Sequence, residues 1–196
     1  MVEPVAGVLL TGGGSRRLGT DKARLVLDGA TLAERAAGRL AAVCDPVVEV
    51  GPGITRCPRV SEEPVGSGPL AALAAGGDAL RRMGRVGPVL LLAVDLPNVT
   101  VGLLELLRDW PGERSVVPDA AGRLQPVCAR YSADALSAAV RLVSGGVRAL
   151  HALLDACGYD VVPQAAWHAI APADVFADVD TPDDAARLGI DLPRLR

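Results

Sequence analysis

Residues 5–24 read VAGVLLTGGGSRRLGTDKAR, an apolar run that stops at glycines and continues as a basic loop. An apolar run without alternation is typical of a strand buried on both faces of a parallel sheet. Consecutive glycines after such a strand let backbone N–H groups approach an anion without obstruction by side chains. Because residues 12–24 also carry four basic residues and one acidic residue, the stretch predicts a phosphate-binding loop at a sheet edge.

The rest of the chain alternates short apolar runs with helical patterns of about 10 to 15 residues. Strands are predicted at 47–50, 88–94, 114–117 and 124–130, and the last two can pair around a turn at 119–123. Helices are predicted at about 31–43, 69–83, 101–109, 132–143, 147–156 and 182–189. This alternation predicts an α/β fold: a three-layer, Rossmann-like, mostly parallel sheet with helices on both faces. A length of 196 residues predicts one domain over 1–196.

Composition excludes several classes of protein. A net charge of −3 and only five aromatic residues argue against nucleic-acid binding. The apolar runs are too short to cross a bilayer, and the first follows Glu3 rather than a basic segment, so we expect neither a membrane span nor a signal peptide. Four cysteines without a C-x-x-C pair are typical of reduced thiols, which predicts a cytoplasmic protein. We expect it to be a monomer.

Two residues stand out as candidates for chemistry. Asp95 directly follows the apolar run 88–94, at the strand end where α/β sheets bind ligands. Mg²⁺ prefers one or two protein carboxylates and takes its other ligands from phosphate and water. Asp95 also lies too far before the helix at 101–109 to cap it. Lys22 is the only lysine beside 19 arginines, which indicates a position that needs a compact ammonium group.

The segment from Leu10 to Lys22, LTGGGSRRLGTDK, resembles the LAGGxSxRMGxDK signature of a family of nucleotidyltransferases, with Thr11 in place of alanine and Leu18 in place of methionine. Within that family it is most similar to the molybdenum cofactor guanylyltransferases. Four later segments also resemble family motifs, in the same order: Glu62 to Leu70, Val94 to Pro97, Arg123 to Tyr131, and Asp178 to Pro182.

The resemblance implies a single nucleotidyltransferase domain that transfers GMP from Mg-GTP to the terminal phosphate of the molybdopterin cofactor and releases pyrophosphate. It implies Mg²⁺ as the cofactor, held by Asp95. The catalytic residues implied are Arg17, Lys22 and Asp95, and the nucleotide-binding residues are Leu10, Thr11, Gly12, Gly13, Lys22, Glu63 and Asp95. It also implies transient contact with proteins that make or receive the cofactor.

Two assignments stay open at this point. Glu62 and Glu63 compete for the acidic position that contacts the nucleotide in the family, and we choose Glu63. Asp180 is either a second metal or nucleotide contact or part of the cap of the helix at 182–189. We prefer the cap, because an acidic or hydroxyl residue before proline commonly begins a helix.

Three alternative functions remain. The chain can be a relative that uses CTP, or one that acts on another phosphorylated acceptor. Guanylyl transfer is favoured because LTGG is nearer to the guanylyl form LAGG than to the LAAG of cytidylyl relatives. A non-catalytic nucleotide-binding regulator on the same fold would be expected to lack Lys22 or Asp95, and both are present.

Overall fold

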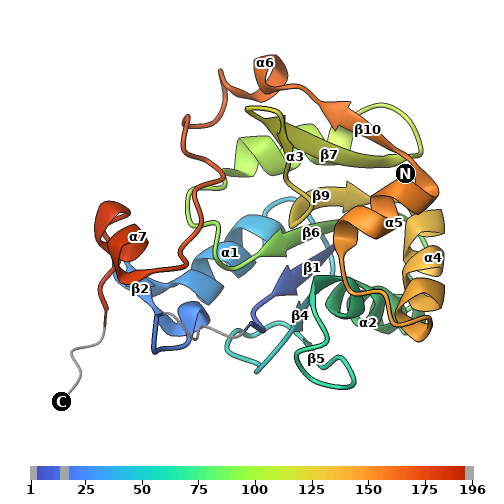
Figure 1. Ribbon diagram of the computed structural model, residues 1–196, viewed down its shortest axis with the longest axis horizontal. Helices are drawn as coiled ribbons and strands as arrows, with labels where there is room; N and C mark the ends of the chain where they lie inside the picture. The colour runs from blue at the N-terminus through green and yellow to red at the C-terminus, as the bar shows by residue number, and fades with distance from the viewer. Residues whose placement is uncertain (1–3, 14–17, 193–196) are drawn as a thin grey trace.

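The centre of the computed structural model, which describes residues 4–13 and 18–192, is a mixed sheet in the strand order β10-β7-β9-β6-β1-β4-β5 (Figure 1). Buried strands form its middle: β9 Cys128–Tyr131, β6 Val89–Ala93, β1 Ala6–Leu10 and β4 Val47–Val50. The flanking strands are β10 Tyr159–Val162, β7 Ser115–Ala120 and β5 Arg59–Val60, and β8 Arg123–Leu124 pairs with β7. A separate two-stranded sheet joins β2 Val26–Leu27 to β3 Ala30–Thr31.

Strand direction places three carboxyl ends at one edge of the sheet. β1 pairs in parallel with β4 on one side and with β6 on the other. In this register Leu10 lies opposite Val50 and Ala93, so the residues that follow all three strands meet. β9 runs antiparallel between β6 and β7. The predicted mostly parallel sheet is therefore confirmed, with one reversed strand inside it.

Helices cover both faces of the sheet, as predicted. The helices α1 Leu32–Ala41 and α3 Val101–Asp109 pack on one face against a core that includes Leu9 and Leu92. On the other face lie α2 Pro69–Arg82, α4 Ala133–Ser144 and α5 Leu150–Cys157, against a core that includes Val8 and Leu91. Side chains alternate across a strand, so the continuous apolar run of β1 serves both cores.

Three short helices complete the chain. They are the 3-10 helix η1 Lys22–Arg24, α6 Gln164–Trp167 and α7 Pro182–Arg187. Figure 1 shows α7 beside β2, far from the pair formed by α4 and α5. Val26 of β2 forms an antiparallel bridge with Asp191, which follows α7. A small core that includes Leu25 and Ala185 packs between the same two segments. The end of the described chain therefore packs against the segment that follows the glycine-rich loop.

The predicted strand at 124–130 is divided into β8 and β9. The backbone turns between them, where the Cys128 N–H donates to the Gln125 carbonyl at 3.1 Å and Pro126 has no N–H to pair. The edge strands β5 and β10 escape prediction because each is short and partly exposed. Within the part of the chain that the structure describes, none of the helices has the length and apolar character needed to cross a membrane.

Candidate active site

A cavity of about 340 Å³ lies at the sheet edge where β1, β4 and β6 end. Most of the residues predicted to bind nucleotide or metal lie in its wall: Leu10, Thr11, Gly12, Gly13, Lys22 and Asp95. The opposite wall comes from the start of α2 and from Val127. Arg17, the remaining predicted catalytic residue, lies outside the described residues. The structure therefore brings together side chains from segments far apart in the sequence.

A second cavity, of about 810 Å³, adjoins the first. The two share a wall formed by Thr11, Gly12, Gly13, Glu62 and Gly66. The turn after β4, Gly51 and Pro52, lines the second cavity. A ligand that extended from Lys22 into the second cavity would contact the shared wall and this turn. These residues are therefore the candidates for determining which ligand binds.

The acidic residue at the shared wall is Glu62 rather than the expected Glu63. Glu62 is buried, with 7% of its surface exposed, and it lines both cavities. Its Oε1 accepts a hydrogen bond from the Gly66 N–H at 3.0 Å, which folds the segment back over the carboxylate. Glu63 is exposed and lines neither cavity. Of the two acids, Glu62 therefore lies at the cavities, whereas Glu63, our choice, does not.

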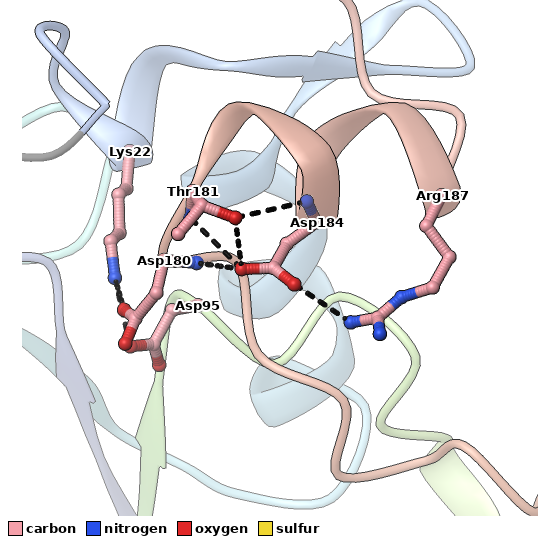
Figure 2. A network of polar contacts seen from close by, with 6 residues as sticks. All are labelled: Lys22, Asp95, Asp180, Thr181, Asp184 and Arg187. Atoms are coloured by element: carbon pink, nitrogen blue, oxygen red, sulfur yellow. Dashed lines mark hydrogen bonds and ion pairs between the residues drawn. The ribbon is translucent and has the colours of Figure 1, made fainter.

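Lys22 extends from η1 toward two carboxylates (Figure 2). The helix begins at Asp21, whose Oδ1 accepts from the Ala23 N–H at 3.0 Å. The Lys22 ammonium lies 3.5 Å from Asp95 Oδ2 and also donates to Asp180 Oδ1. Only 16% of the Lys22 side chain is exposed. The single lysine of the chain is thus held at the cavity as a largely desolvated cation, where its charge acts more strongly than at an open surface.

Asp95 has an oxygen that no described group satisfies. Its Oδ2 faces Lys22, whereas Oδ1 is buried and has no hydrogen-bond partner among the described residues. Burial raises the pKa of Asp95 above its ordinary value; the Lys22 charge opposes this shift, and the Asp180 charge adds to it. A buried carboxylate oxygen in this position favours a further positive charge. The donor chemistry therefore fits a hard divalent cation such as Mg²⁺.

The N-cap of the last helix is Thr181 and not Asp180, whose backbone N–H takes part by donating to Asp184 Oδ2 at 3.2 Å. Thr181 is the N-cap of α7, and its side chain accepts from the Asp184 N–H while the Asp184 carboxylate accepts from the Thr181 backbone (Figure 2). This capping box leaves the Asp180 carboxylate directed at Lys22 beside Asp95. Within 4–13 and 18–192, no group of three or more His, Cys, Asp or Glu side chains is placed to hold a metal ion. Of the two carboxylates that Lys22 contacts, Asp95 lines the cavity and Asp180 lies beside it, and Mg²⁺ commonly uses one or two carboxylates.

Sequence reasoning missed Glu49, the polar residue of the buried strand β4. It is fully buried, and its carboxylate accepts from Thr11 Oγ1 at 2.6 Å and from the backbone N–H groups of Gly53, Ile54 and Thr55. Burial would raise the pKa of Glu49, but these hydrogen bonds outweigh it and hold the pKa below its ordinary value. The signal in the sequence is an acid inside the apolar run VVEV.

The turn after β4 approaches the end of β1 so closely that only glycine fits at position 51. A Cβ added to Gly51 would lie 2.6 Å from the Gly12 nitrogen and would overlap Thr11 Oγ1, and the residue has a φ of 150°. Gly51→Ala is expected to lower the free energy of unfolding by about 1–3 kcal/mol, because the backbone must shift to relieve the overlap. Urea unfolding measures this loss. Gly87→Ala is the control, since its added Cβ meets nothing within 4 Å; equal stability of the two variants would contradict the close approach.

The chain is similar in sequence to known nucleotidyltransferases. Residues 7–157 match the model of a family described as the MobA-like NTP transferase domain. A probable molybdenum cofactor guanylyltransferase from Chloroflexus aggregans is 32% identical over 194 residues, which covers 92% of this chain and 91% of that protein.

Solved structures show the same fold at lower identity. Molybdopterin-guanine dinucleotide biosynthesis protein A from Archaeoglobus fulgidus superposes with a TM-score of 0.78 at 23% identity, over 94% of this chain and 96% of that one. A protein from Mycobacterium tuberculosis H37Rv in complex with manganese superposes with a TM-score of 0.66 at 16% identity, over 98% and 100% of the two chains.

Proposed function

The chain belongs to the MobA-like NTP transferase family and is a nucleotidyltransferase; on that basis we propose that it transfers GMP from Mg-GTP to the terminal phosphate of the molybdopterin cofactor. The observation that carries the proposal is that Lys22 and Asp95 line one cavity with Gly12 and Gly13, while Asp180 also contacts Lys22. A cation and a metal-binding carboxylate beside backbone N–H groups form a site for phosphates. We also propose that residues 1–196 act as one nucleotidyltransferase domain.

In the proposed reaction, an oxygen of the acceptor phosphate forms a bond to the α-phosphorus of GTP. The bond between that phosphorus and the oxygen bridging to the β-phosphate breaks, and pyrophosphate leaves. A phosphate monoester has a second pKa near 6 and is largely dianionic at neutral pH, so the nucleophile needs no general base. Lys22 and Arg17 hold the phosphates and stabilise the developing negative charge. Mg²⁺, held by Asp95 with Asp180 beside it, supplies further neutralisation of that charge when bound.

The base is proposed to lie against the wall that the two cavities share. Guanine presents an N1–H and an exocyclic amine as adjacent donors, and a carboxylate accepts both. Glu62 is the buried acid at this wall, and the backbone groups of Leu10, Thr11 and Gly12 line the cavity beside it. The corresponding edge of cytosine has a single donor, its exocyclic amine, beside two acceptors, so one Glu62 oxygen would face an acceptor and stay unpaired. A buried acid at the wall is the reason to prefer GTP over CTP.

We expect GTP to be the preferred nucleotide, by a factor of 10³ or more over CTP and ATP, because a site built from hydrogen bonds rejects a base that leaves them unmade. The test is pyrophosphate release with each of the four nucleotides, with and without molybdopterin. Glu62→Gln should lower the preference for GTP, since an amide places a donor where the base also donates. Glu63→Gln is the matched control on the exposed neighbour. CTP used as well as GTP would refute guanylyl transfer while leaving the phosphate site intact.

The same assay separates the alternatives. Turnover of GTP only with a different phosphorylated acceptor would change the substrate and keep the reaction class. Nucleotide binding without pyrophosphate release from any nucleotide, whatever the acceptor, would support a regulatory protein instead.

A further inference from the structure

We propose that Glu49 is a positioning residue for the nucleotide: through Thr11 it fixes the wall of the binding site to the turn after β4. The inference rests on the proposed function, because it assigns a role in nucleotide affinity. It concerns a side chain that lines neither cavity and therefore has no direct access to a ligand there.

Glu49 lies inside the sheet, not at its rim. In the parallel register it is opposite Leu9 of β1 on one side and Arg59 of β5 on the other. None of its surface is exposed, and no ion pair joins it to a cation among the described residues. An apolar side chain of similar volume would serve a buried strand as well or better. Its carboxylate is therefore best explained by the groups that it binds.

Those groups belong to two segments that the carboxylate ties together. On the loop side, Oε1 accepts from the N–H groups of Gly53 and Ile54 at 3.0 and 2.8 Å, and Oε2 accepts from the Thr55 N–H at 2.8 Å and from its hydroxyl at 2.7 Å. On the β1 side, Oε1 accepts from Thr11 Oγ1 at 2.6 Å. The charge is thus balanced by five donors, four from the loop and one from the site wall.

The connection runs directly to residues that bound both cavities. Thr11 lies in the shared wall, and the turn residues Gly51 and Pro52 line the second cavity. At this junction the backbone N–H groups of Thr11 and Gly12 both donate to the single carbonyl of Val50, at 3.0 and 3.3 Å. The Glu49 carboxylate adds a charge-assisted link across the same junction. It sets the separation between the wall and the turn.

The link to Glu49 depends on the hydroxyl of Thr11, a position at which this protein differs from the signature that it resembles. That signature has alanine at the position of Thr11, and alanine has no hydroxyl to donate. Removing the hydroxyl while keeping the side-chain shape therefore breaks the link, together with the longer 3.5 Å contact of Thr11 Oγ1 with the Val50 carbonyl. Thr11→Val does this, and it leaves the backbone groups of residue 11 in place.

The test measures KM for GTP, kcat and amide hydrogen exchange in Thr11→Val, Thr11→Ser and Glu49→Gln. We expect KM to rise about tenfold in Thr11→Val and Glu49→Gln, as for the loss of one hydrogen bond to a charged group, with kcat within twofold of the starting protein. Thr11→Ser keeps a hydroxyl and should restore the low KM. Amides of residues 53–55 should exchange faster in the valine and glutamine variants without any ligand present. Thr100→Val is the control, since it removes another hydroxyl hydrogen bond, the cap of α3, away from both cavities.

Each result has one meaning. Faster exchange at 53–55 with an unchanged KM would show that the link holds the loop but does not position the nucleotide, and would overturn the inference. An equal rise in KM in Thr100→Val would do the same, because the effect would then be general loss of stability. If Glu49→Gln does not fold, the pair Thr11→Val and Thr11→Ser decides alone. If the starting protein releases no pyrophosphate, the proposed function fails separately, and nucleotide dissociation constants of the same variants replace KM.

Discussion

Replacing Asp95 with asparagine is expected to lower the rate of pyrophosphate release by about 10³-fold, since a metal-binding charge contributes several kcal/mol to the transition state. The substitution keeps the size of the side chain and removes its charge. Asp95 Oδ1 is buried without a described partner, so the charge is unfavourable to the folded protein when nothing binds it. The melting temperature should therefore be unchanged or higher. Steady-state assays over a range of Mg²⁺ concentration, together with thermal unfolding, measure both effects.

The matched control is Asp109→Asn, at an exposed carboxylate paired with Arg108. It should change the rate by less than about twofold, as expected for a surface substitution distant from the site. The assignment of Asp95 as a metal ligand would be wrong if the Asp95→Asn variant kept a near-normal rate at millimolar Mg²⁺ and normal stability.

Lys22 provides the second large effect. Lys22→Ala is expected to reduce the rate by about 30- to 1,000-fold, the result of losing one charge-assisted contact of roughly 2–4 kcal/mol in the transition state. Lys22→Arg should not recover this loss. The ammonium is largely enclosed and lies between Asp95 and Asp180, where a planar and longer guanidinium places its charge differently. Single-turnover rates at saturating nucleotide distinguish this loss from weaker binding.

Arg24→Ala is the matched control for Lys22. Arg24 belongs to the same short helix η1, but its side chain is exposed and lines neither cavity. It should retain most of the rate. If Lys22→Ala and Lys22→Arg both keep at least half of the original rate, Lys22 has no catalytic role.

Local patterns were sufficient to predict the part of the site that directly follows strands. The end of β1 and Asp95 each follow a buried apolar run, and the parallel register brings such ends together by geometry alone. The capping box of α1 also follows from a local pattern, a threonine at 31 three residues before a glutamate at 34. These features could be predicted because residues close together in the sequence determine them.

Features that depend on tertiary contacts were not predictable in the same way. Two adjacent acids, Glu62 and Glu63, look alike in the sequence, and a hydrogen bond from the Gly66 N–H accompanies the inward placement of the first. Asp180 was assigned to a helix cap, because the sequence does not show that Thr181 is the N-cap or that Lys22 lies nearby. Glu49 was missed, since its role depends on a loop that folds back onto the strand.

The contact between Lys22 and Asp180 joins residues 158 positions apart, and Asp180 lies beyond residue 157, where the family match ends. On the ribosome, where synthesis proceeds from the N-terminus at about 5–20 residues per second, the glycine-rich loop and most of the sheet emerge well before Asp180. The Asp180 carboxylate is therefore synthesised 158 residues after Lys22. A nascent chain can build its sheet early, but it has both carboxylates that contact Lys22 only after Asp180 has been added.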